Sequence, residues 1–208
     1  MGAQKRIALY GGTFDPVHLG HIEIARTVAE LFEIEKVLFV PAQVAPHKIG
    51  RPVTEPIHRY AMLALATQDD PKLLISTFEL DAPDRRYTVD TVEHFQRSLG
   101  DSTELFFIMG ADSWSDITTW REWERLLKMT NHIVVTRPDY EVAKAPPGLG
   151  ERVFFTDAVR KDISATNIRR LASEGRFDDL TKFVPQSVAN YIRKYEIYRD
   201  SNEARLNS

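Results

Sequence analysis

The chain has 208 residues, a formal net charge of −3 and no cysteine, which suits one large domain or a domain with a small annex. With this charge the protein has no overall positive field that would attract nucleic acid or a membrane surface. Any anionic substrate must therefore be bound by locally placed Lys and Arg side chains and by helix ends. The lack of cysteine excludes disulfides, a thiol nucleophile and cysteine-ligated zinc, and without a signal-peptide or membrane-span pattern we expect a cytoplasmic protein.

Short apolar runs alternate with longer amphipathic stretches along most of the chain. Strands are predicted at residues 6–10, 36–40, 73–77, 104–109, 132–136 and 152–155. Helices are predicted near residues 17–33, 56–69, 88–98 and 120–129. This alternation predicts a Rossmann-like, doubly wound α/β fold, with a mainly parallel sheet, helices on both faces and right-handed crossovers.

A small C-terminal helical region is predicted after about residue 160, where the strand pattern stops. Its three helical pieces lie near residues 166–174, 178–182 and 185–198. We therefore expect a single domain over residues 1–200, with this subregion at about 160–200 and a flexible tail at 201–208. Two stretches rich in Pro and Gly, residues 43–56 and 138–150, are predicted to be surface loops, which often carry function.

The stretch YGGTFDPVHLGH at residues 10–21 follows the first predicted strand directly. Gly11 and Gly12 allow close backbone approaches that a side chain would block. Asp15 followed by Pro16 is a typical N-cap and first residue of a helix. We therefore expect a strand, a turn and a capped helix in these twelve residues.

Two histidines lie near the N-terminal end of that predicted helix. Their spacing from the helix's apolar positions places His18 and His21 on the side that faces the sheet. Free N–H groups and the helix dipole favour anions at this end, and ligands of open α/β sheets bind beyond the carboxyl ends of the strands. A phosphate site is the favoured interpretation over two half-buried structural histidines.

The motif in residues 10–21 is neither G-x-G-x-x-G nor G-x-x-x-x-G-K-[ST]. Instead, GGTFDPVHLGH resembles the signature of the nucleotidyltransferase superfamily, in which His18 and His21 form the H-x-G-H element. A second signature of that superfamily, I-S-[ST]-T-x-I-R, is similar to ISATNIR at residues 163–169. The resemblance implies transfer of a nucleotidyl group from a nucleoside triphosphate to a phosphate-bearing partner, with release of pyrophosphate.

The second signature also has a physical interpretation of its own. Ser164 and Thr166 are candidate N-caps, and Arg169 is expected in the first turn of the helix that follows. There its guanidinium fork could bind phosphate oxygens, although these residues by themselves favour a solvated arginine on an ordinary capped helix.

The middle of the chain resembles the bacterial nicotinate mononucleotide adenylyltransferases. PAQVAPHK at residues 41–48 is similar to their P-x-x-x-x-P-H-K element, which implies that His47 and Lys48 contact the triphosphate. YTVDT at residues 87–91 is similar to their Y-T-x-D-T element, in which Thr88 begins a helix and binds the pyridine carboxylate.

A third element of that family, G-x-D-x-x-x-x-[LIF]-x-x-W, matches residues 110–120. The resemblance implies that Gly110 admits the nucleotide, Asp112 binds ribose hydroxyls and Trp120 stacks on the pyridine ring. Arg121 stands where many relatives have tyrosine. It could pair with the nicotinate carboxylate or be an exposed helix residue, so the preference for nicotinate over nicotinamide stays open.

The resemblance predicts a reaction of NAD biosynthesis, in which ATP and nicotinate mononucleotide give nicotinate adenine dinucleotide and pyrophosphate. His18, His21 and Arg169 are the implied catalytic residues, and Mg²⁺ is expected to enter with ATP, with no protein ligand assigned to it. Small-molecule substrates are expected as partners, without nucleic acid or membrane, and an oligomer is possible. The implied nucleotide-binding residues are Gly11, Gly12, Thr13, Phe14, His47, Lys48, Gly110, Asp112, Ser164 and Thr166.

Three other functions are considered. Pantetheine-phosphate adenylyltransferases share the first signature but tend to carry threonine at the position of His18. A zinc hydrolase could use His18, His21 and His47, although the spacing lacks the H-E-x-x-H layout. A nucleotide sensor without catalysis is disfavoured because both phosphate-binding motifs are intact.

Overall fold

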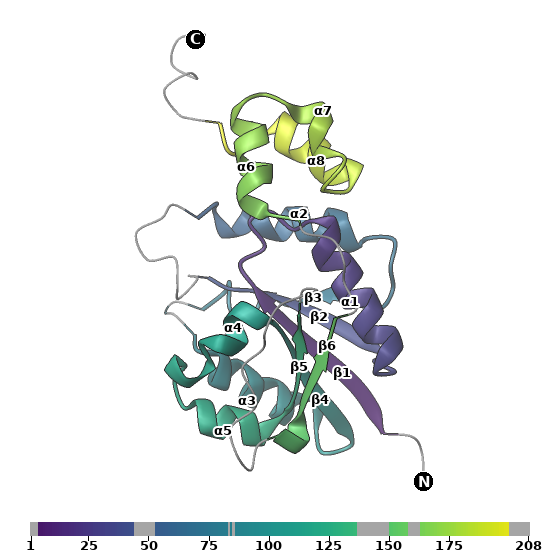
Figure 1. Ribbon diagram of the computed structural model, residues 1–208, viewed down its shortest axis with the longest axis vertical. Helices are drawn as coiled ribbons and strands as arrows, with labels where there is room; N and C mark the ends of the chain where they lie inside the picture. The colour runs from purple at the N-terminus through teal and green to yellow at the C-terminus, as the bar shows by residue number, and fades with distance from the viewer. Residues whose placement is uncertain are drawn as a thin grey trace.

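A computed structural model describes residues 4–43, 53–82, 84, 86–136, 150–157 and 163–199. Six parallel strands form one sheet in the order β3-β2-β1-β4-β5-β6 (Figure 1). All six predicted strands are confirmed. Their bounds are Lys5–Gly12 for β1, Lys36–Pro41 for β2, Leu73–Ile75 for β3, Thr103–Gly110 for β4, Asn131–Val135 for β5 and Val153–Thr156 for β6.

The strand order reverses at the centre of the sheet, between β1 and β4. From β1 the chain winds outward through β2 and β3, and it then returns to the other side of β1 with β4. Gly12 pairs with Pro41 and Gly110 with Val135, so these strands all end at the same edge. A crevice at the carboxyl edge beside such a reversal is where doubly wound folds bind ligands.

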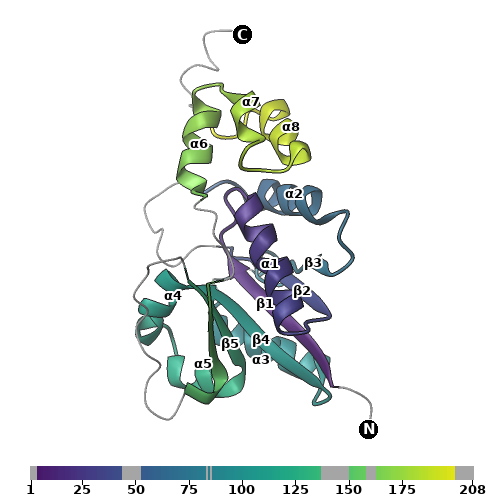
Figure 2. The ribbon, with the colours of Figure 1, turned by 45° about the vertical axis from the view of Figure 1, so that its right-hand side comes forward.

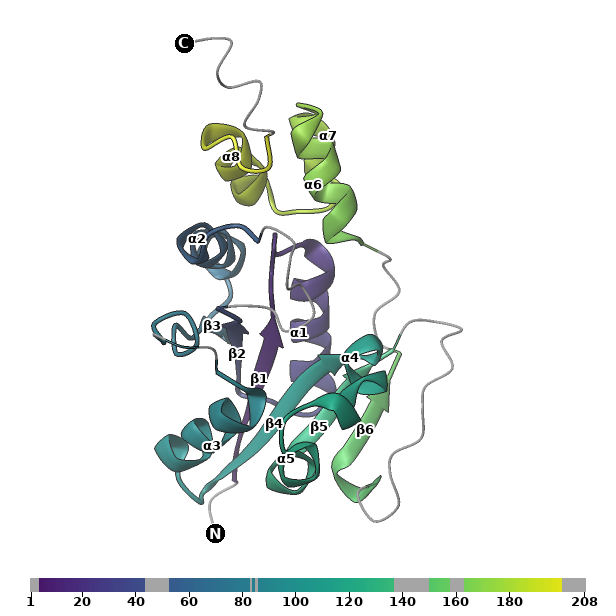
Figure 3. The same ribbon diagram turned by 90° about the vertical axis from the view of Figure 1, so that its left-hand side faces the viewer.

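Helices cover both faces of the sheet, because successive side chains of each strand point to opposite faces. Ala8 and Tyr10 of β1 belong to the core cluster under α1 (Leu19–Leu31) and α2 (Pro56–Thr67), whereas Leu9 belongs to the opposite cluster. That opposite face carries α3 (Thr88–Leu99), α4 (Ala111–Ser115) and α5 (Trp123–Met129), as Figure 3 shows. The predicted Rossmann-like architecture is therefore confirmed.

Three C-terminal helices lie beyond the carboxyl end of β1, next to α2 (Figures 1 and 2). They are α6 (Ala165–Ser173), α7 (Phe177–Leu180) and α8 (Gln186–Lys194). Ile168 of α6 is fully buried in the α1 side of the core, and the Leu19 N–H donates to the Phe183 carbonyl at 2.8 Å. These contacts fix the C-terminal helices against the start of α1.

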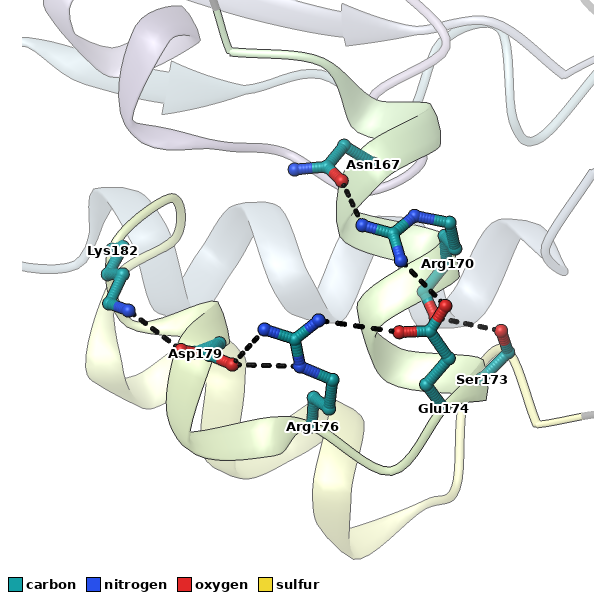
Figure 4. A network of polar contacts seen from close by, with 7 residues as sticks. All are labelled: Asn167, Arg170, Ser173, Glu174, Arg176, Asp179 and Lys182. Atoms are coloured by element: carbon teal, nitrogen blue, oxygen red, sulfur yellow. Dashed lines mark hydrogen bonds and ion pairs between the residues drawn. The ribbon is translucent and has the colours of Figure 1, made fainter.

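An exposed polar network covers the corner between α6 and α7 (Figure 4). Arg170 donates to Glu174 and to the Asn167 side chain, at 2.6 and 2.9 Å. Arg176 donates to Asp179 at 2.7 Å. Exposed ion pairs contribute little stability individually, but these bonds occupy the guanidinium of Arg170, the immediate neighbour of Arg169.

The predicted helix near residues 120–129 is shorter than expected. A 3₁₀ turn at Ile117–Thr119 comes first, and α5 begins only at Trp123. Glu122 has φ +50°, a left-handed conformation that interrupts a helix. The predicted loops at 43–56 and 138–150 and the tail at 201–208 lie largely or wholly outside the described residues. Within the described ranges, no helix is long and apolar enough to cross a membrane.

Candidate active site

The start of α1 differs from the prediction. Asp15 is not its N-cap, because the helix begins at Leu19 with His18 in the capping position. The Asp15 carboxylate is instead 4% exposed and accepts hydrogen bonds from the Tyr198 hydroxyl at 2.7 Å and the Thr54 N–H at 3.3 Å. These distant partners, which no local pattern reveals, remove Asp15 from the capping role.

The two motif histidines form a stacked pair at the N-terminus of α1. Their ring centroids are 3.6 Å apart, with 19° between the ring planes. The His18 backbone N–H donates to His21 Nδ1 at 3.2 Å. Because Nδ1 of neutral His21 accepts this bond, its Nε2 carries the proton and is a donor. A helix N-terminus with an imidazole donor is suited to bind phosphate oxygens.

Gly20 gives the histidine pair its space. A Cβ built at this position would lie 3.1 Å from His18 Nδ1 and 3.8 Å from the Cβ of Ile163. The glycine of the H-x-G-H element therefore lets the first signature pack against the residue that opens the second one. This role of Gly20 was not predicted from the sequence.

Arg169 joins the two signatures. Its Nη1 donates to the Asp15 carbonyl at 2.7 Å, and its Nη2 donates to Thr166 Oγ1 at 3.1 Å. Ser164 is the N-cap of α6, as predicted. Arg169 is the fifth helical residue, not a first-turn residue as expected, and its long side chain reaches back toward the helix start. The contact with Asp15, three residues before His18, brings the Arg169 guanidinium to the loop that leads into the first signature.

A buried arginine that the sequence reasoning missed holds the loop before α1. Arg59 of α2 is 0% exposed and donates to the carbonyls of Thr13 and Thr54, each at 2.9 Å, and of Gln43 at 3.3 Å. Burial lowers the pKa of this guanidinium, and the Asp15 carboxylate opposes that shift. The signal was available, because Arg59 lies three and four residues before the buried Met62 and Leu63, on the same side of the helix.

The predicted glycines of β1 accommodate aromatic rings. A Cβ at Gly11 would lie 2.9 Å from the Phe107 ring, and one at Gly12 would lie 2.8 Å from the ring of Phe14. Phe14, at φ +50°, is buried and packs edge-to-face against His21, with 5.0 Å between centroids. The Phe14 ring therefore packs against the His21 ring and helps to fix its position.

Open space lies at the end of β4. A Cβ at Gly110 would meet nothing within 4 Å among the described residues. Gly110 is the N-cap of α4, and Asp112 is an exposed residue of its first turn. Both predicted nucleotide-binding residues are therefore accessible at the carboxyl edge of the sheet.

The predicted pyridine-binding residues come from two neighbouring segments. Thr88 is the first residue of α3, and the Asp90 carboxylate accepts a hydrogen bond from the N–H of the capping Tyr87 at 3.2 Å. The Arg121 guanidinium lies over the Tyr87 ring, 4.7 Å from its centroid. Trp120 packs edge-to-face on a core phenylalanine, and its indole N–H is buried without a partner among the described residues. Arg121 thus lies beside the start of α3, as a shared subsite requires.

His47 and Lys48 lie outside the described residues. Across the part of the chain that the structure describes, no group of three or more histidine or carboxylate side chains is arranged to hold a metal ion.

Comparison with known proteins identifies the family. Residues 9–171 match the cytidylyltransferase-like family. A probable nicotinate-nucleotide adenylyltransferase of Thermoanaerobacter sp. is 39% identical over 98% of this chain and 99% of its own length. One of Thermus thermophilus is 43% identical over 93% of this chain and 100% of its own. The chain belongs to the nicotinate-nucleotide adenylyltransferase family.

Solved structures agree with this adenylyltransferase fold. Plasmodium falciparum nicotinic acid mononucleotide adenylyltransferase complexed with NaAD has a TM-score of 0.76 at 21% identity, covering 93% of this chain and 97% of that chain. A putative nicotinate-nucleotide adenylyltransferase of Vibrio parahaemolyticus has a TM-score of 0.70 at 16% identity, covering 95% and 97%.

One further group of this adenylyltransferase chain was missed from the sequence. Glu79, between β3 and α3, accepts a hydrogen bond from Thr91 Oγ1 at 2.7 Å. Burial raises the pKa of Glu79 to about 7, although Thr91 and the nearby Arg86 favour its charged form. Through Thr91, Glu79 therefore contacts the first turn of α3, which begins at Thr88.

Proposed function

We propose that the protein transfers the adenylyl group of ATP to nicotinate mononucleotide, giving nicotinate adenine dinucleotide and pyrophosphate. The observation that carries this proposal is the convergence of two helix N-termini on one loop. The stacked His18 and His21 open α1, and the Arg169 guanidinium on α6 contacts the Asp15 carbonyl of that loop. The family relationship supports the same reaction.

The chemistry needs positioning and charge neutralisation. A phosphate oxygen of the mononucleotide attacks the α-phosphorus of ATP, and the bond from that phosphorus to the bridging oxygen breaks, which releases pyrophosphate. The attacking group is already anionic, so no strong base or covalent nucleophile is required. The transition state gains charge on the phosphoryl and leaving oxygens, where hydrogen-bond donors are most effective.

The phosphate donors are assigned from the helix ends. His18 and His21 bind the α- and β-phosphate oxygens, together with the backbone N–H groups of Thr13 and Phe14. Arg169 contacts the β- and γ-phosphates, with Lys48 as a second cation and Ser164 and Thr166 at the same helix end. Mg²⁺ enters as the ATP complex. The Asp15 carboxylate is already bound by Tyr198 and Thr54, which favours a metal held by phosphates and water.

The two ends of the dinucleotide are assigned to two groups of the residues at and after the end of β4, together with the start of α3. Gly110 admits the adenosine at the end of β4, and Asp112 binds its ribose hydroxyls. Trp120 stacks on the pyridine ring, and Thr88 with Arg121 binds the nicotinate carboxylate. The position of Arg121 over the Tyr87 ring, beside Thr88, supports the carboxylate role.

A pyrophosphate-release assay tests the function. Purified protein with Mg²⁺ and ATP should react with nicotinate mononucleotide, more slowly with nicotinamide mononucleotide, and with neither phosphopantetheine nor ATP alone. Arg121→Ala should reduce the difference in reaction rate between nicotinate mononucleotide and nicotinamide mononucleotide. Arg125→Ala, the control, should leave that difference unchanged. Faster turnover with phosphopantetheine would assign the rival transferase reaction, and binding of ATP without turnover would indicate a sensor.

A further inference from the structure

A partly buried tyrosine of the C-terminal turn, Tyr198, contacts the loop between β1 and α1, residues 13–18. The Tyr198 hydroxyl donates to Asp15 Oδ1 at 2.7 Å across 183 residues of sequence. Burial is the main reason that the pKa of Tyr198 is raised, and the Asp15 carboxylate raises it further. The hydroxyl therefore stays protonated at neutral pH and remains a donor.

The turn that carries Tyr198 is held in an unfavourable backbone conformation. Glu196 has φ +52° and Tyr198 has φ +75°, although neither residue is glycine. Left-handed backbone conformations are unfavourable for residues with a Cβ. Between them Ile197 is buried in the α1-side core. The turn is thus anchored by the Ile197 side chain, which lies between the two left-handed residues, and by the hydrogen bond from Tyr198 to Asp15.

Asp15 connects this turn to Arg169. Its side chain is fixed by Tyr198 and Thr54, and its backbone carbonyl accepts the Arg169 Nη1–H at 2.7 Å. Arg59 fixes the Thr13 carbonyl on the other side of the same loop. Hydrogen bonds therefore hold Thr13 and Asp15 in this loop, and the Asp15 carbonyl is also one of the two acceptors of the Arg169 guanidinium among the described residues.

We propose that Tyr198 is a positioning residue for Arg169, which it orients through Asp15. The inference rests on the proposed role of Arg169 in binding ATP phosphates. Catalysis by positioning is sensitive to small displacements, and about 1 Å can cost on the order of 100-fold in rate. Loss of the Tyr198 hydroxyl removes one of two bonds to the Asp15 side chain and relaxes the loop without altering any group proposed to touch substrate.

The test compares Tyr198→Phe with Tyr195→Phe. Tyr195 lies in the same turn and is 50% exposed, so its hydroxyl serves as the matched control. Tyr198→Phe should lower kcat about tenfold and raise the Kd for Mg-ATP several-fold, while the KM for nicotinate mononucleotide stays within twofold of the wild-type value. Tyr195→Phe should match the wild type in all three.

A double-mutant cycle separates positioning from general stabilisation. In an Arg169→Ala background, Tyr198→Phe should cause no further loss in kcat or in Mg-ATP affinity, because its effect passes through Arg169. A full tenfold loss in both backgrounds, or wild-type kcat for Tyr198→Phe, would overturn the inference. If Tyr198→Phe does not fold, Asp15→Asn in the same cycle decides. An inactive wild-type protein would instead refute the proposed function, and the inference with it.

Discussion

The glycine of the H-x-G-H element should separate stability from activity when it is replaced by alanine. Gly20 is the second residue of α1, and an alanine Cβ would lie 3.1 Å from His18 Nδ1 and 3.2 Å from its Cε1. Both distances are a few tenths of an ångström short of ordinary contact. The His18 ring cannot yield freely toward its neighbour, because it already stacks on His21 at 3.6 Å.

We expect Gly20→Ala to leave the unfolding free energy nearly unchanged but to lower kcat. Alanine in place of glycine in a helix contributes about 0.5–1 kcal/mol of stability, which offsets the crowding, so we expect the unfolding free energy to change by less than about 1 kcal/mol. A shift of the His18 ring by a few tenths of an ångström should lower kcat about tenfold, which corresponds to roughly 1.4 kcal/mol in the activation barrier. Gly20→Ser, with its larger side chain, should lower kcat further.

Steady-state pyrophosphate release and urea unfolding measure the two effects. Gly100→Ala is the matched control with the reverse pattern. Gly100 ends α3 at φ +74° with open space around it, so alanine should cost about 1 kcal/mol of stability and leave kcat unchanged. Gly20→Ala with wild-type kcat, or with a large loss of stability, would refute the assigned contact between Gly20 and the His18 ring, which we propose to be catalytic.

Three further predictions address the motifs and the buried titratable groups. His21→Ala should lower kcat by orders of magnitude, since it removes a proposed hydrogen-bond donor to phosphate, while circular dichroism shows a native fold; an active, folded variant would contradict the proposed role. Arg169→Ala should weaken Mg-ATP binding at least tenfold by calorimetry, whereas Arg170→Ala should not, because Arg170 is bound to Glu174 and Asn167 (Figure 4); equal effects would show that Arg169 acts only through net charge. Because burial raises the pKa of Glu79 from 4.5 to about 7, the folded state holds a proton that the unfolded state releases, so this group's stabilisation falls as pH rises from 4.5 to 7. Glu79→Gln should remove that slope in urea titrations and leave the opposite one from His132, whose pKa burial lowers to about 4, so that its stabilisation falls as pH drops from 6.5 to 4; an unchanged pH profile would contradict the assignment to Glu79.

The fold was predictable because its signals are local and repeated. Apolar runs on both faces of each strand indicated a buried parallel sheet, and the amphipathic stretches between them indicated the covering helices. The five-residue α4 has too few turns for a detectable period, and the left-handed Glu122 that delays α5 has no local sequence signature. These features depend on tertiary packing.

The site was predictable where chemistry is concentrated in a short motif. The placement of His18 and His21 at the carboxyl edge of the sheet followed from the first signature and one rule about parallel sheets, whereas the stacking of their rings was not predicted. The mistake at Asp15 has a nonlocal cause, since a tyrosine 183 residues later takes the carboxylate that would otherwise cap α1. Arg59 was overlooked although its position on an apolar helix face was visible.

The hydrogen bond between Asp15 and Tyr198 also constrains when the enzyme can mature during synthesis. Parallel strands and contacts of large sequence separation form late, because the intervening chain must be closed first. A nascent chain that still lacks Tyr198 can assemble its sheet but cannot form the hydrogen bond to Asp15 in the loop between β1 and α1. Full affinity for ATP should therefore arise only after translation has passed residue 198.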